Sequence, residues 1–249
     1  MPKKVATEQK PGTDLSVYWK HKRKLNKLAL EYTQNMDKEA VREKLQTGSV
    51  GILPTICISR KIGVGALELA ETLSASLGYR VIDREIIEEI SNRTELSRSS
   101  IETFDERYPG KIREFLGLML GDRSFGLDAY TRHLFVIAFV LAGMESTIFV
   151  GRGIHLMLPR QQVFAIRCIS SVERRAKRLE ASLKVSRKKA EQILTHADAE
   201  QKEFFSKVHG KDAADPAEFD MTLNLDHIKD LNTAAQAVTL LFKSRFPAT

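Results

Sequence analysis

The sequence is poor in cysteine and histidine, and this shortage excludes two classes of site. The two cysteines, Cys57 and Cys168, lie far apart without C-x-x-C spacing. We therefore expect two buried reduced thiols rather than a disulfide framework. The six histidines are scattered without H-E-x-x-H or similar spacing, so we expect no metal site built from side chains.

The sequence also lacks a long apolar run. Its most apolar stretch, residues 134–143, has about half of the ~20 residues that a membrane-spanning helix needs. The start of the chain has no apolar segment of the kind that marks a secretory signal. These features predict a cytoplasmic protein with no membrane contact.

Positive charge is in excess, but it is concentrated at the start of the chain. The 249 residues include 39 Lys/Arg and 32 Asp/Glu, which gives a formal net charge of +7. Residues 1–50 hold 11 of the Lys/Arg against 6 Asp/Glu and so supply +5 of that charge. The remaining balance of +2 is too small to predict nucleic acid as a partner of the main part of the chain.

We interpret residues 1–50 as a basic N-terminal extension and residues 51–249 as one α/β domain. An apolar stripe predicts a helix over residues 18–46, which begins with the basic run KHKRK (20–24). KHKRK could contact nucleic acid or a membrane surface. We favour the other interpretation, a solvated helix that packs on the domain or on a second subunit of a homo-oligomer.

The stretch TICISRKIGVGALELA (55–70) has the clearest local pattern. Its first apolar run, residues 56–58, is typical of a buried parallel strand. Leu69 and Leu73 have the four-residue spacing of an amphipathic helix. The glycine-bearing turn between them would present backbone N–H groups and a helix N-terminus to a phosphate. The candidate phosphate-binding residues are Arg60, Lys61, Gly63, Val64, Gly65 and Ala66.

Compared with the phosphate-loop pattern G-x-x-x-x-G-K-[ST], this turn is incomplete. With Gly65 as the last glycine, Arg60 occupies the place of the first one. Ala66 then stands at the lysine position and Leu67 at the hydroxyl position. A phosphate site and a purely structural turn are both open interpretations of these glycines.

Polar residues follow two further predicted strands, at the edge where ligands of open parallel sheets collect. Asp83 and Arg84 follow a strand predicted at 79–82, and Arg152 follows one predicted at 147–150. Asp83 could contact substrate or a magnesium-bound water, or cap the next helix. Arg152 could hold a phosphate with its planar guanidinium, or form an internal salt bridge. Further strands are predicted at 163–169 and 221–225, and helices at 129–144 and 231–246.

Six blocks in collinear order over residues 55–245 resemble the cytidylate kinase-like family of P-loop proteins. They are SRKIGVG (59–65), YRVIDREII (79–87), FDERYPG (104–110), FVGRGIHLML (149–158), AIRCISSVERRAKRL (165–179) and FDMTLNLDHI (219–228). The resemblance implies a three-layer α/β P-loop kinase fold with a five-stranded parallel sheet. It also implies a helical nucleotide-acceptor insertion and a lid over residues 184–210, in which we expect two short helices.

The same resemblance gives roles to single residues. Backbone amides of residues 63–66 would hold the donor phosphates, and Arg152 would hold the acceptor. Arg174 and Arg178 share one helix face and would neutralise charge on the transferring phosphoryl group; a solvated basic face is the other interpretation. The acceptor-side candidates are Asp83, Arg84 and Asp105, of which Asp105 could instead belong to a solvated turn.

Two blocks depart from the family pattern. The block that resembles G-R-D has Gly153 in place of the Asp, which bears on the recognition of cytosine or deoxyribose. The lid block that resembles D-x-x-R-x-x-F has Gln201 in place of the Arg. Arg187 and Lys188 are candidate substitutes for that arginine.

The resemblance implies a nucleoside monophosphate kinase of the cytidylate type, which binds nucleotides and uses ATP with Mg²⁺. The alternative is a catalytically impaired relative that binds a nucleotide or another phosphorylated ligand and has a regulatory role. A third interpretation is an oligomeric scaffold or nucleic-acid-associated protein that acts through KHKRK. The alternatives stay open because the loop lysine, the loop hydroxyl and the lid arginine are missing.

Overall fold

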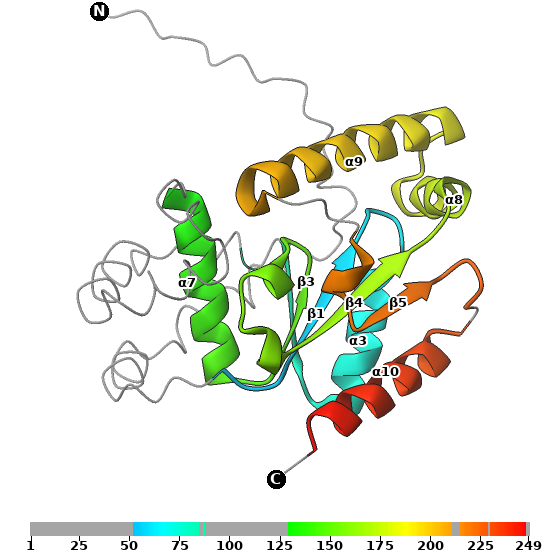
Figure 1. Ribbon diagram of the computed structural model, residues 1–249. Coiled ribbons are helices and arrows are strands. Elements are labelled where there is room, and N and C mark those ends of the chain that lie inside the picture. Colours follow the sequence, from blue (N-terminus) through cyan, green and yellow to red (C-terminus); the bar gives the residue numbers. More distant parts are fainter. Residues whose placement is uncertain (1–51, 85–86, 88–128, 211–214, 229, 248–249) are drawn as a thin grey trace, which may run out of the picture.

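A central sheet of five parallel strands organises the structure, a computed structural model that describes residues 52–84, 87, 129–210, 215–228 and 230–247 (Figure 1). The spatial order of the strands is β2-β3-β1-β4-β5. Since every neighbouring pair is parallel, all five strands bring their carboxyl ends to one edge. The predicted α/β fold class is confirmed. The strands are β1 (Thr55–Arg60), β2 (Arg80–Asp83), β3 (Thr147–Val150), β4 (Val163–Ile169) and β5 (Met221–Asn224).

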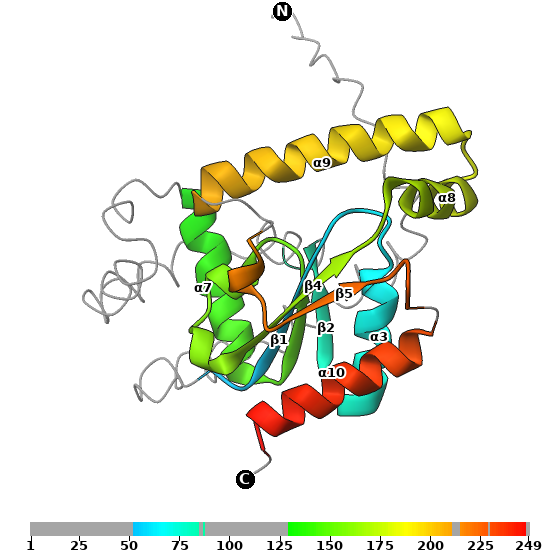
Figure 2. The ribbon, with the colours of Figure 1, turned by 45° about the vertical axis from the view of Figure 1, so that its right-hand side comes forward.

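Helices cover both faces of this sheet, which is why its inner strands β1 and β3 are buried over almost their whole length. Successive side chains of β1 alternate between the two faces. Ile56 and Ile58 pack with residues of α3 (Ala66–Leu77) and α10 (Leu231–Arg245), which lie next to each other (Figure 2). Cys57 packs instead with residues of α7 (Ala129–Met144). The result is a three-layer arrangement with one apolar cluster on each face.

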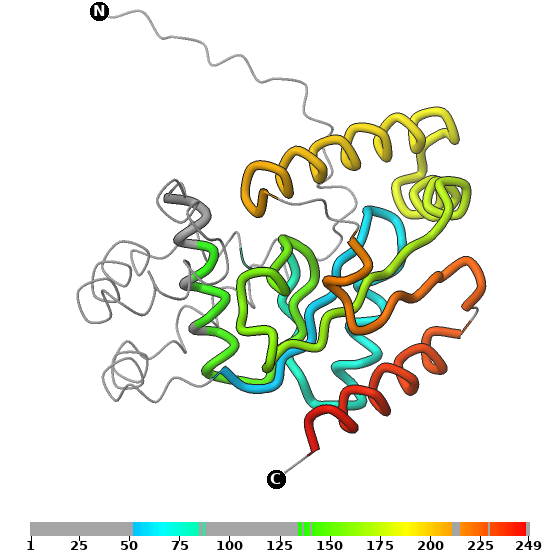
Figure 3. The backbone as a smooth tube through the Cα atoms, viewed as in Figure 1, coloured from blue at the N-terminus to red at the C-terminus, as the bar shows by residue number. Residues whose placement is uncertain are grey.

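Two more helices lie beyond the carboxyl edge of the sheet. The helix α8 (Val172–Leu183) follows β4, and α9 (Arg187–His209) then runs across that edge (Figures 1 and 2). A small apolar cluster that includes Leu179 and Ile193 holds the two helices together. Short 3₁₀ turns complete the described chain, and Figure 3 traces it from β3 into β4 through two of them. These turns are η3 (Ile154–Leu156), η4 (Arg160–Gln162) and η5 (Pro216–Glu218).

The prediction of two short helices within the lid is wrong. Instead, α9 is one continuous helix of 23 residues, with Ser186 as its N-cap and Gly210 as its C-cap. No glycine or proline interrupts residues 187–209. Three ion pairs at four-residue spacing, such as Arg187–Glu191, add to the stability of the helix. The local sequence therefore favours one continuous helix at the point where we expected a break between two helices.

Smaller differences concern single positions. The strand expected at 79–82 is Arg80–Asp83, and β5 ends at Asn224 rather than at residue 225. Ala235, Val238, Leu241 and Phe242 are the apolar residues of the C-terminal helix from which the sequence predicts packing on the sheet, but Leu241 is 46% exposed, because α10 buries the neighbouring face that contains Val238 and Phe242. The predicted N-terminal helix and acceptor insertion, with Asp105, lie outside the described residues. None of the described helices has the length and the hydrophobicity that a membrane span requires.

Candidate functional site

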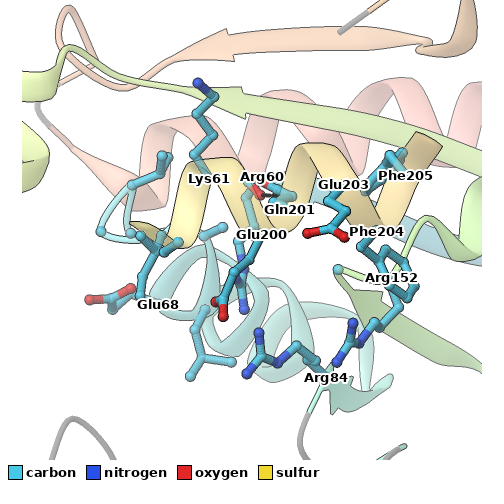
Figure 4. A pocket seen from close by; sticks show the side chains of 18 of the residues that line it. Arg60, Lys61, Glu68, Arg84, Arg152, Glu200, Gln201, Glu203, Phe204 and Phe205 are labelled. Carbon is cyan, nitrogen blue, oxygen red and sulfur yellow. Dashed lines mark hydrogen bonds between the residues drawn. The ribbon is translucent and has the colours of Figure 1, made fainter. Parts of the chain in front are cut away.

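A cavity of about 630 Å³ lies between the carboxyl edge of the sheet and α9 (Figure 4). Four segments form its walls: the loop between β1 and α3, the end of β2, the end of β3 and the underside of α9. This is the edge at which the sequence predicted ligand binding. The side chains that matter below are those of Arg60, Glu68, Glu71, Arg84, Arg152, Glu200, Gln201, Glu203 and Phe204.

The glycine loop between β1 and α3 has the backbone that a phosphate site needs. Gly63 and Gly65 have φ values of 79° and 97°, a conformation that favours glycine. Gly65 is the N-cap of α3 and has no side chain that could cap the first turn. The first N–H groups of α3 are therefore available to an anion from outside the helix. Val64 and Ala66, two of the predicted loop residues, are themselves buried in the apolar core.

Helices α8 and α9 hold this loop from behind. A Cβ built on Gly63 would lie only 3.0 Å from the carbonyl oxygen of Arg175. Nε of Arg175 donates a hydrogen bond to the carbonyl of Ile62 at 2.8 Å, and Nε2 of Gln201 donates one to the carbonyl of Arg60 at 2.7 Å. Two carbonyls of the loop are thus directed toward α8 and α9 rather than into the cavity.

Arg175 is the central residue of this attachment, and sequence reasoning missed it. Its side chain, which is 2% exposed, donates to both carboxylate oxygens of Asp198 at 2.9 and 2.6 Å. Lys61 also reaches Asp198, at 3.2 Å, so its amine points away from the cavity (Figure 4). The sequence offered one clue, since the lid block that resembles the family pattern begins with the carboxylate Asp198. Helical spacing alone gave no reason to choose Arg175 over its neighbours Arg174 and Arg178.

Arg152 lies at the carboxyl end of β3, as predicted, in an unusual backbone conformation. Its φ is 55°, and both of its neighbours also have positive φ, 99° at Gly151 and 67° at Gly153. The guanidinium carbon lies 4.5 Å from the centroid of the Phe204 ring of α9, a cation–π contact. Figure 4 shows Arg152 and Arg84 next to each other in the cavity.

Three arginines give the cavity a cationic wall. Burial, followed by the charges of Arg84 and Arg60, lowers the pKa of Arg152 to about 10, while Glu200 acts in the opposite sense. The side chain therefore stays cationic at neutral pH but gains from a nearby anion. Converging cations of this kind are the footprint of a phosphate or carboxylate ligand.

The sequence model of the cytidylate kinase-like family matches residues 55–227. This match includes the glycine loop, Arg84, Arg152 and most of the residues around the cavity. The chain belongs to the cytidylate kinase-like family.

Comparison with solved structures agrees with the fold. An uncharacterized protein from Eubacterium ventriosum gives a TM-score of 0.59 at 19% identity, over 76% of this chain and 98% of that chain. Shikimate kinases from Bacteroides thetaiotaomicron and Acinetobacter baumannii give TM-scores of 0.41 and 0.39 at 13% and 16% identity. They cover 78% and 79% of this chain, and 99% and 96% of their own. A search of the curated proteins gives no match.

The family's G-R-D block has Gly153 at its third position in this chain, and the structure explains how that space is used. A Cβ built on Gly153 would lie 2.4 Å from Nε2 of His209, the last residue of α9. The same nitrogen lies 3.0 Å from the carbonyl oxygen of Arg152. The histidine ring thus fills the place of the missing side chain and ties α9 to β3. No sequence signal connected these two residues.

The remaining predicted residues fall into two groups. Arg178 contacts the glycine loop, because a Cβ built on Gly65 would lie 3.3 Å from its guanidinium carbon. Asp83 is buried at the end of β2, directly before the cavity residue Arg84. Arg178 itself is not part of the cavity lining, and neither are Arg174, Arg187 and Lys188, of which Arg187 is paired with Glu191.

Carboxylates also face this cavity, from α3 and from α9. Glu68 and Glu71 come from the first turns of α3, and Glu200 and Glu203 from the underside of α9. Within the described ranges, no group of three His, Cys, Asp or Glu side chains could hold a metal ion. The family's kinase-like character, the cationic wall and the glycine loop together indicate a site for a phosphorylated ligand.

Proposed function

We propose that this chain is a nucleoside monophosphate kinase-like phosphotransferase that uses ATP with Mg²⁺. One observation carries the proposal: Arg84 and Arg152, at the ends of β2 and β3, line the same cavity as the glycine loop, which Arg60 precedes. A cavity with two separate phosphate-binding walls suits a reaction between two phosphorylated nucleotides. Family membership supports the same reaction class.

The residues of the donor side fit ATP. The N-terminus of α3 and the positive-φ glycines offer backbone N–H groups to phosphates, which no side chain in the loop obstructs. Mg²⁺ usually binds through substrate phosphates and one or two carboxylates, and Glu200 and Glu203 of α9 present carboxylates to the same cavity. When bound, the metal would neutralise charge on the donor phosphates.

The residues of the acceptor side would position the second nucleotide. Arg152 and Arg84 would hold its phosphate, and the contact with Phe204 keeps the Arg152 guanidinium in place. An oxygen of this phosphate bonds to the γ-phosphorus as the bond to the leaving ADP breaks. Because the protein needs to contribute little covalent chemistry, positioning and charge would supply the rate.

A second candidate is a relative that binds a nucleotide without transferring phosphate, and specific residues favour it. Ala66 and Leu67 stand where the loop lysine and hydroxyl belong. Gln201 stands at the lid arginine, and its amide is already used by the carbonyl of Arg60. Such a protein would respond to a nucleotide rather than convert it.

A coupled ADP-release assay with Mg-ATP and CMP, dCMP or UMP tests the proposal, together with calorimetric binding of the same nucleotides. We expect acceptor-dependent ADP release, which Arg152→Gln should lower in kcat/KM by about 100-fold or more. Arg80→Gln is the control, because Arg80 lies at the opposite end of β2 and pairs with Glu145. That variant should retain the activity.

The outcomes separate the candidates. Acceptor-dependent release that Arg152→Gln abolishes supports the kinase. Binding without turnover rejects the kinase and supports the second candidate. Absence of both binding and turnover in folded protein would reject both, and the basic N-terminal extension would become the next place to search.

A further inference from the structure

Arg60 precedes the glycine loop and lines the cavity, but the helix end of the loop, at Gly65 and Ala66, has no cation of its own. Ala66 occupies the position of the loop lysine, and Lys61 turns away to Asp198. Donor phosphates carry several negative charges, and backbone N–H groups alone neutralise only part of them. A cation at this wall therefore has to come from another element.

Arg178 of α8 lies directly against the last glycine of the loop. A Cβ built on Gly65 would lie 3.3 Å from both the Cζ and the Nη2 atoms of Arg178. The same Nη2 donates a hydrogen bond to Oε1 of Glu68, in the first turn of α3. The guanidinium thus sits beside the N-terminus of α3, where helix dipoles favour an anion.

The pairing with Glu68 satisfies only part of the guanidinium. Nε of Arg178 is buried and has no hydrogen-bond acceptor among the described residues. A guanidinium presents Nε and one Nη as a fork that fits two phosphate oxygens. A phosphate in this place would give Nε the acceptor that Glu68 does not supply.

The ion pair is also of a kind that exchanges readily. The side chains of Arg178 and Glu68 are 34% and 48% exposed, so their pairing contributes little to folding stability. Glu68 lines the cavity, and its carboxylate can turn into solvent when another anion takes its place. A phosphate, with more charge and more acceptor oxygens, competes well for an arginine fork.

The family resemblance already implies that Arg178 neutralises phosphate charge; we infer in addition that Glu68 is the resident counter-ion of Arg178, which a donor phosphate displaces. The inference rests on the proposed function, because it places the donor phosphates at the same loop. Glu68 acts as a built-in competitor that weakens anion binding. The affinity of the site for its donor then depends on how much more strongly Arg178 binds the donor phosphate than it binds Glu68.

The test is the binding of ADP and of inorganic pyrophosphate to the full chain, measured by titration calorimetry. Glu68→Gln should tighten both by about 2- to 5-fold, the range that an exposed ion pair accounts for. Arg178→Gln should weaken both by about tenfold or more, because charge-assisted hydrogen bonds are lost. In the double variant, the gain from Glu68→Gln should vanish.

Glu71→Gln is the matched control, because Glu71 lies about one turn further along α3 and lines the same cavity. Glu71→Gln removes the same charge without releasing Arg178, and it should therefore give the smaller gain in affinity for the two probes. An equal gain from both variants, or a gain that persists in the Arg178→Gln background, would overturn the inference.

Circular dichroism checks that each variant is folded. If Arg178→Gln does not fold, Arg178→Lys replaces it, since lysine keeps the charge but loses the two-pronged fork. The proposed function fails in a different way, when wild type and all variants bind neither probe. Binding by wild type without any effect of Glu68→Gln rejects the inference and leaves the proposed function standing.

Discussion

At the scale of single residues, Arg175 fixes the conformation of the glycine loop. It links three elements at once, because its guanidinium binds the carbonyl of Ile62 and the carboxylate of Asp198 while its backbone carries α8. A buried arginine is costly unless all its donors are engaged. Here each of the three guanidinium nitrogens donates a hydrogen bond, one to the Ile62 carbonyl and two to the Asp198 carboxylate. The loop is therefore shaped before any ligand binds.

This gives a stability prediction. Asp198→Ala should lower the free energy of unfolding by about 3 kcal/mol, because it leaves the buried charge of Arg175 without its carboxylate. The measurement is urea denaturation followed by circular dichroism. Lys61→Gln is the control, since Lys61 contacts the same carboxylate but is 47% exposed, and it should cost less than about 1 kcal/mol. Equal losses in the two variants would contradict the role given to Arg175.

At the scale of elements, α9 covers the cavity and contacts the rest of the domain along its length. Asp198 and Gln201 attach it to the glycine loop, Phe204 packs on Arg152, and His209 fills the space beside Gly153. These contacts follow one another at helical spacing, so one continuous helix can make all of them. A helix broken in the middle could not keep this register. The structure thus gives a physical reason for the single helix in place of two.

The contact at the end of α9 can be tested with a pair of glycine variants. Gly153 and Gly78 both have positive φ, 67° and 71°, but a Cβ on Gly78 would meet nothing within 4 Å. Gly78→Ala should therefore lower the free energy of unfolding by only about 1 kcal/mol, the strain of a left-handed backbone at an alanine. Gly153→Ala should cost about 1–3 kcal/mol more, because its methyl group collides with His209.

Thermal unfolding of the two variants gives the difference. His209→Ala in the Gly153→Ala background should recover part of the extra loss, because it removes the ring from the collision. If the two glycine variants lose the same stability, then the His209 ring moves aside without cost. In that case its contact with Gly153 does not hold α9 against β3.

At the scale of the whole molecule, the cavity is assembled from segments that are distant in sequence. The hydrogen bond between Gln201 and Arg60, for example, joins residues 141 positions apart. A ligand in the cavity would contact the β1–α3 loop, the ends of β2 and β3, and α9 together. Its binding would therefore hold the layers of the domain against one another.

We therefore expect ligand binding to raise the stability of the entire described domain. ADP at about 100 times its Kd should add about 2.7 kcal/mol, and the melting temperature should rise by about 5–10 °C. The measurement is thermal unfolding with and without ADP. Adenosine is the control, because it lacks the phosphates for which the cavity is cationic, and it should change little. An equal rise in melting temperature with adenosine would mean that the nucleoside, and not the phosphates, provides most of the binding free energy.

Much of the architecture was predictable because local patterns decide it. The bounds expected for β3, β4 and α7 are those of the structure, since apolar runs and helical spacing report burial directly. Gly78 ends α3 in the left-handed conformation that glycine favours. The glycine turn and Arg152 were placed at the correct edge of the sheet, because the carboxyl ends of parallel strands all lie on one side.

The partners of the charged side chains were not predictable in this way. Arg175 binds Asp198 and Arg178 binds Glu68, although the two arginines lie only three residues apart on one short helix. A periodic pattern tells which face of a helix is apolar but not which carboxylate a given arginine meets. That choice depends on how α8 is rotated against the loop, to which Gly63 and Gly65 give room.

The sequence by itself determined the parallel sheet, the glycine turn before α3 and the cations at the strand ends, because each depends on residues that are neighbours in the chain. The tertiary structure alone decided that α9 is one helix fastened over the cavity, that His209 occupies the space beside Gly153, and that Glu68 holds Arg178. These contacts join residues 52 to 141 positions apart where α9 meets the sheet edge, and 110 apart for Glu68 and Arg178. Packing selects such partners by distance and shape, which no local pattern encodes.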